Sequence, residues 1–85
     1  YPAINLIDKI NQYISAPIIV NAVNEILVDY YLQKKISFKG IYDYLYLVLK
    51  DKNYKKYAIQ KPSSLKKIYD IDNWARNKTK ELVEK

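Results

Sequence analysis

The 85-residue sequence contains no cysteine and no histidine, and it has a single glycine, Gly40. These absences exclude disulfides, zinc sites built on cysteine or histidine, a cysteine nucleophile and a Ser–His–Asp triad within this chain. One glycine also excludes a Walker-type phosphate loop and a GxGxxG dinucleotide fingerprint. We therefore expect the chain alone to be catalytically inactive and to bind no cofactor or metal by itself.

Methionine and long hydrophobic runs are also missing. A complete translation product begins with methionine, so the chain is expected to be a fragment or processed piece of a longer protein. No apolar stretch approaches the ~20 residues of a membrane span, and no signal-peptide pattern is present. Because 49% of the residues are hydrophobic, the chain should fold, and its length suits a single domain over residues 1–85.

Positive charge is concentrated in the second part of the chain. The net charge is +6, but residues 1–33 sum to −2 and the remainder to +8. A basic half fits an acidic partner such as nucleic acid. The competing explanation is compositional, because the abundant Lys, Asn, Ile and Tyr share AT-rich codons. A free-standing basic helical interaction or nucleic-acid-binding module therefore stays an alternative.

Hydrophobic periodicity predicts two helices in the first part of the sequence. Isoleucines recur on one helical face over residues 1–14, and Pro17 is expected to end this helix. A second helix is expected to start at Ile18, or after Asn21 as its N-cap, and to run to about Lys34. It is apolar on three sides, which predicts a central helix surrounded by others.

Two further helices are predicted after this central helix. Ser37 is expected to cap the third, over residues 38–52, and residues 53–62 are expected to form a loop. Ser63 or Ser64 is expected to cap the last helix, in which Asp72 either restarts the helix or lies exposed within it. The expected apolar positions of these two helices are Phe38, Ile41, Tyr42, Leu45, Val48, Leu49, Leu65, Ile68, Ile71, Ala75, Leu82 and Val83. The predicted fold class is all-α, a small four-helix bundle-like domain.

A polar stripe interrupts the apolar second helix. Asn21, Glu25, Asp29 and Gln33 follow one another at intervals of four, and Asn24 lies beside them. Residues four apart lie on one helical face, so these side chains form a narrow stripe. Since Glu25 and Asp29 are like charges one turn apart, the stripe should meet a cation or water.

Arg76 is the only arginine, and its planar fork suits a carboxylate. It is expected to pair either with Asp72, four residues earlier, or with Glu25 or Asp29 of the stripe. Trp74 and the ten tyrosines are interpreted as packing residues with a polar edge at the surface, and a stacking platform for bases is the alternative. Glu25 with Asp29 would bind a metal only as part of a larger set of oxygens.

Two stretches show a resemblance to a known family. Residues 17–41, PIIVNAVNEILVDYYLQKKISFKGI, resemble a segment of 1-deoxy-D-xylulose 5-phosphate (DXP) reductoisomerases, P-x-x-x-N-A-A-N-E-x-x-V-x-x-F-L-x-x-x-I-x-F-x-x-I. Residues 61–76, KPSSLKKIYDIDNWAR, are similar to the family's closing pattern P-x-S-L-x-x-[IV]-x-x-x-D-x-W-A-R. The resemblance covers about residues 1–77. It departs at QYISAP, where the family often has a glycine-containing turn.

The resemblance implies the C-terminal helical domain of an enzyme that uses NADPH and a divalent metal (Mg or Mn). That enzyme converts DXP to 2-C-methyl-D-erythritol 4-phosphate in non-mevalonate isoprenoid synthesis. The expected partner is the upstream catalytic domain of the same polypeptide, in a parent enzyme expected to be a homodimer, with no nucleic-acid or membrane partner. The expected location is a plastid-type organelle of a eukaryote, with the bacterial cytoplasm as the alternative.

The motif residues have three possible roles under this resemblance. Asn21, Asn24 and Glu25 either hydrogen-bond the catalytic domain as an interface stripe or form a capped helix start with an internally satisfied polar network. Direct contact with substrate is the third. The candidate interface or structural residues are Asn21, Asn24, Glu25, Asp29, Asp72, Trp74 and Arg76.

Overall fold

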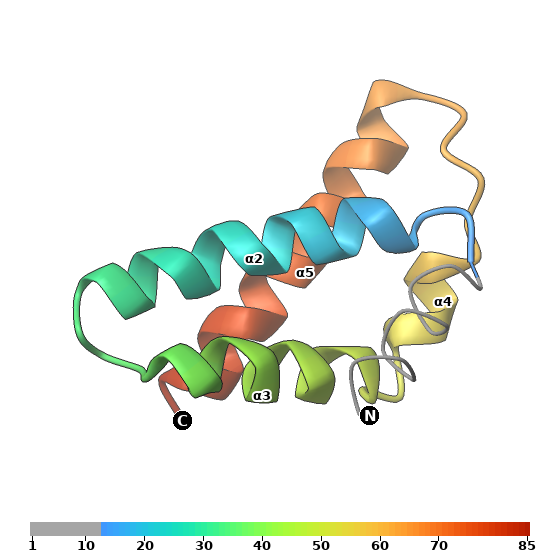
Figure 1. The fold of residues 1–85 in the computed structure, drawn as a ribbon. Coiled ribbons are helices and arrows are strands. Elements are labelled where there is room, and N and C mark those ends of the chain that lie inside the picture. Colours follow the sequence, from blue (N-terminus) through green and yellow to red (C-terminus); the bar gives the residue numbers. More distant parts are fainter. Residues whose placement is uncertain (1–12) are drawn as a thin grey trace.

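The computed structural model describes residues 13–85, which form four helices and contain no strand. The helices are α2 (Ala16–Leu32), α3 (Phe38–Leu49), α4 (Tyr54–Ala58) and α5 (Leu65–Val83). α2 and α3 form an antiparallel pair, and α5 crosses behind α2 and passes alongside α3 (Figure 1). The predicted all-α class is confirmed. The helix expected over residues 1–14 lies, apart from its last two positions, outside the described residues.

The start of α2 corrects the predicted boundary, because the helix begins at Ala16, before both expected starts. Pro17 occupies the first turn, where a missing backbone N–H costs nothing. Ser15 precedes the helix but does not cap it with its side chain. Its backbone N–H donates to the Ala58 carbonyl at 2.8 Å, and its hydroxyl donates to the Gln60 carbonyl. Ser15 therefore connects the start of α2 by hydrogen bonds to the last residue of α4 and to the chain that follows it.

The connection from α2 to α3 is a tight turn with a defined cap at each side. Lys34 has a φ of 62°, in the left-handed region that usually takes glycine. Its N–H donates to the Tyr31 carbonyl at 2.9 Å, and the Lys35 N–H donates to the Tyr30 carbonyl at 2.9 Å, which satisfies the last carbonyls of α2. The predicted Ser37 cap is confirmed, since its Oγ accepts from the Gly40 N–H at 3.0 Å.

Residues 53–62, predicted as a loop, contain the short helix α4. Its first and last residues, Tyr54 and Ala58, are both buried. They lie four residues apart, so one helical turn places both side chains on the core side. The Tyr54 ring also meets the Tyr13 ring edge-on, with centroids 6.1 Å apart. Burial of Tyr54 and Ala58 stabilises this short helix. The local sequence, which is rich in lysine and tyrosine, did not indicate that these two side chains would be buried.

The core lies where α2, α3 and α5 meet. Its fully or nearly buried apolar side chains include Ile19, Val23, Leu27, Leu45, Val48, Leu49 and Ile71. Several predicted apolar positions are nevertheless exposed, notably Phe38 and Leu65. The end of α2 is also exposed at Leu32, so α2 is not surrounded along its whole length as predicted. No helix among residues 13–85 is long and apolar enough to cross a membrane.

Candidate functional site

Arg76 joins α5 to the polar stripe of α2. Its Nε donates to Asp72 Oδ2 at 2.8 Å, and its Nη2 donates to Glu25 Oε2 at 2.6 Å. The planar guanidinium directs its donors in fixed directions, so one side chain serves a carboxylate on each helix. The hydrogen bond to Asp72, then the one to Glu25, raises the pKa of Arg76. Both predicted pairings, with Asp72 and with Glu25, are therefore present together.

Asp29 does not join this cluster. Its carboxylate accepts a hydrogen bond at 2.7 Å from the side-chain amide of Gln33, the C-cap residue of α2, and this bond is exposed to solvent. The stripe is thus divided into two parts. Glu25 is tied across to α5, whereas Asp29 and Gln33 pair along the helix and remain exposed.

Asn21 and Asn24 are exposed on α2, and their side chains make no hydrogen bond within residues 13–85. Because α2 starts at Ala16, Asn21 lies in the helix interior and is not the N-cap considered above. The polar network inside this chain therefore includes Glu25 and leaves out the two amides. Each amide presents a donor and an acceptor to whatever adjoins this face.

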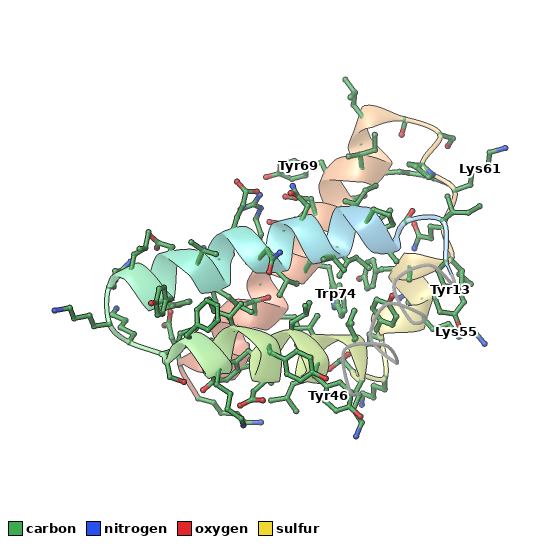
Figure 2. The ribbon with its side chains drawn as sticks, viewed as in Figure 1. Tyr13, Tyr46, Lys55, Lys61, Tyr69 and Trp74 are labelled. Atoms are coloured by element: carbon green, nitrogen blue, oxygen red, sulfur yellow. The ribbon has the colours of Figure 1, made fainter. Side chains whose placement is uncertain are left out.

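Trp74 lies on a different side of α5 and packs within the chain. Its ring stacks on Tyr57 of α4, with centroids 4.8 Å apart and planes 13° from parallel. Figure 2 shows Trp74 within the body of the molecule and Tyr69 on its outer side. Half-buried between α4 and α5, Trp74 matches the packing interpretation better than a stacking platform open to bases.

A second ion cluster was not predicted. Lys78 Nζ lies 3.2 Å from Asp51 Oδ2, in the turn after α3, and 3.5 Å from Glu81 Oε2. The hydrogen bond to Asp51 is the main cause of the raised pKa of Lys78. The spacing of three residues between Lys78 and Glu81 was a visible signal, but nothing local in the sequence indicated that Asp51 would be brought to α5.

No group of three or more acidic side chains in residues 13–85 is arranged to hold an ion. Glu25 and Asp72 both accept hydrogen bonds from Arg76. No dinucleotide fingerprint is present either. We therefore derive no catalytic step from these side chains.

Comparison with known proteins gives the family. The profile of the DXP reductoisomerase C-terminal domain matches residues 1–78. The chain belongs to this family. Among curated DXP reductoisomerases, it is 33% identical to the Chlorobium limicola protein over 84 residues, 35% identical to that of Zymomonas mobilis over 85, and 42% identical to that of Blochmanniella pennsylvanica over 79.

These alignments cover 98%, 99% and 92% of this chain, but only 21%, 21% and 19% of the three reductoisomerases. The chain thus spans about a fifth of the length of the DXP reductoisomerases that it matches. All three of these relatives are bacterial. No solved structure gives a significant match.

Proposed function

We propose that this chain is the C-terminal structural domain of a DXP reductoisomerase, the NADPH- and metal-dependent enzyme that makes 2-C-methyl-D-erythritol 4-phosphate. The family match over residues 1–78 supports this proposal. The groups that bind NADPH, metal and substrate belong to the part of the polypeptide that precedes this domain. No observation favours the alternative of a free-standing basic module.

The role proposed for the domain is to pack on the catalytic part through the face shared by α2 and α5. Arg76 fixes the two helices against each other at this face. Asn21 and Asn24 then hold fixed positions and can hydrogen-bond the catalytic part, since nothing in residues 13–85 engages their amides. Groups held in place in this way support an active-site wall without taking part in the chemistry.

The oligomeric state and the location of the parent enzyme also follow from the proposed family role. The parent enzyme is proposed to be a homodimer. Within each polypeptide, this domain packs on the catalytic part of the same chain. The bacterial relatives favour the bacterial cytoplasm over the plastid-type organelle that the AT-rich composition suggested. The composition fits an AT-rich bacterial genome equally well.

Complementation tests the proposal. The 85-residue chain is mixed with the preceding part of the polypeptide, and NADPH consumption is followed with DXP and a divalent metal. Turnover by the mixture, and by neither part alone, is expected. Equal turnover by the preceding part alone would contradict the structural role, and an inactive intact polypeptide would contradict the assigned activity.

A matched pair of variants tests the proposed face. Asn24→Ala is expected to weaken complementation, because it removes an amide from the α2 and α5 face. Asn77→Ala removes the same kind of amide from an exposed position of α5. Asn77 lies on another surface of the domain, beside Trp74 and Lys78. An equal loss of turnover from both variants would contradict a specific role for the face shared by α2 and α5.

A further inference from the structure

The first turns of α5 stand apart from the rest of the molecule. Residues 65–70 are all exposed, on every side of the helix. Figure 1 shows this part of α5, in orange, projecting past α2 beyond the body of the fold. Burial begins only at Ile71. A helix normally owes most of its stability to packing of one face, and in these turns even Ile68 is only partly covered.

The projecting turns nevertheless have an apolar face. Leu65 is 85% exposed, Ile68 39% and Tyr69 67%. Ile68 and Tyr69 lie three and four residues after Leu65, so both are neighbours of Leu65 on the same side of the helix. Together with Lys66 and Asp72 they form one open area of surface on this side of α5.

This face is continuous with the polar cluster at Arg76. Asp72 borders this surface and also accepts a hydrogen bond from Arg76, which donates another to Glu25 of α2. An apolar surface with a polar border at one side is the arrangement of an interaction surface. The charges close to it are mixed, and Lys66 pairs with Asp70 at 3.2 Å, so charge does not select a strongly acidic or basic partner.

We propose that Leu65, Ile68 and Tyr69 dock into an apolar recess on the part of the same polypeptide that precedes this chain. The inference rests on the proposed function for the existence of that part, and most of the length of the relatives lies outside this chain. Three apolar side chains are too few for an association between separate molecules, which uses about 20–30 residues a side. A covalent link supplies a high effective concentration, so a small patch suffices within one polypeptide.

The turn between α2 and α3 provides a matched reference. Leu32 and Phe38 are 71% and 75% exposed there, close to the values for Leu65 and Tyr69. Phe38 already packs edge-on against Tyr31, with centroids 5.7 Å apart, and Lys34 and Lys35 flank the turn. This patch is therefore anchored within its own chain and bordered by cations, and we assign no docking to it.

Thiol labelling of the full polypeptide tests the proposal. The chain contains no cysteine, so Leu65→Cys, Tyr69→Cys and Leu32→Cys each place one thiol in it. Maleimide labelling of each position is read by peptide mass spectrometry, and each native rate is divided by the rate of the same variant in denaturant. Positions 65 and 69 should label roughly ten-fold more slowly than position 32, because a covered thiol reacts only after local opening.

Equal normalised rates at positions 65, 69 and 32 would overturn the proposal. Protection at position 65 that grows with protein concentration would assign the surface to a second copy, and would overturn it as well. The same preparations are assayed for turnover of DXP. Turnover together with equal labelling rejects only the docking site, whereas an unmodified intact polypeptide without turnover rejects the proposed function.

Discussion

The two parts of α5 differ in what holds them in a helix. From Ile71 onward the helix buries a residue every four positions, and Ile71, Ala75 and Thr79 are completely enclosed. Before Ile71, residues 65–70 are exposed, and the least exposed of their apolar side chains, Ile68, is only partly covered. The comparison shows that one continuous helix can contribute to the core with one part and present a free surface with the other.

Two isoleucines one turn apart give the largest expected difference between these parts. Ile71→Ala should lower the free energy of unfolding by about 2–5 kcal/mol, because it leaves a cavity in the core. Ile68→Ala removes the same atoms from a partly exposed position and should cost less than about 1 kcal/mol. Urea unfolding of the two variants, followed by circular dichroism, measures both. Similar losses would show that the first turns of α5 are packed in this chain after all.

Arg76 and Lys78, two cations of the packed part, should differ in the same way. Lys78 and Asp51 have side chains only 17% exposed, whereas Arg76 is 31% exposed and its partners Asp72 and Glu25 are 29% and 58% exposed. Lys78→Met should therefore cost about 1–2 kcal/mol, between the values for surface and buried pairs. Arg76→Lys should cost less than about 1 kcal/mol, since it keeps the positive charge and the Arg76 cluster is more exposed than the Lys78 pair.

The sign of the pH dependence gives a check on the Lys78 pair. The folded-state pKa of Lys78 is raised, so its stabilisation is fully present below the unfolded pKa and is lost as pH rises through the folded value. The difference in unfolding free energy between Lys78→Met and the unmodified chain should therefore be constant from pH 7 to 9. A difference that disappeared within that range would contradict the proposed pairing with Asp51.

The far end of α5 is held by Tyr30, whose hydroxyl donates to Glu84. This hydrogen bond, followed by burial, raises the pKa of Tyr30 to about 12. An unfolded tyrosine ionises near pH ~10, so the stabilisation is present below that pH and is lost between about pH 10 and 12. Tyr30→Phe should cost about 1 kcal/mol at pH 8. Unfolding measured at several pH values should show this difference narrowing above pH 10, and a constant difference would contradict the shift.

The sequence predicted those features that depend on local chemistry. The helix class, the Ser37 cap and the pairing of Arg76 followed from spacing and side-chain type. The short helix α4 and the Asp51 partner of Lys78 did not, because tertiary burial and a long-range approach created them. Leu65 was assigned to the apolar face of its helix and was found exposed, since periodicity identifies a face and not what covers it.

The two serine caps give the smallest expected difference between two matched variants. Ser37 Oγ accepts from the Gly40 N–H at 3.0 Å, at the start of a helix that packs in the core. Ser64 Oγ accepts from the Lys67 N–H at 3.2 Å, at the start of the projecting turns.

Ser37→Ala should cost about 1 kcal/mol, the usual value for loss of an N-cap. Ser64→Ala should cost less than about 0.5 kcal/mol in this chain, because the first turns can fray without opening the core. In the full polypeptide, docking of Leu65 and Tyr69 would couple these turns to a packed surface, so the cost of Ser64→Ala should rise toward that of Ser37→Ala. Urea unfolding of both variants in both contexts measures this change, and a Ser64→Ala cost that stayed small in the full polypeptide would speak against a docked start of α5.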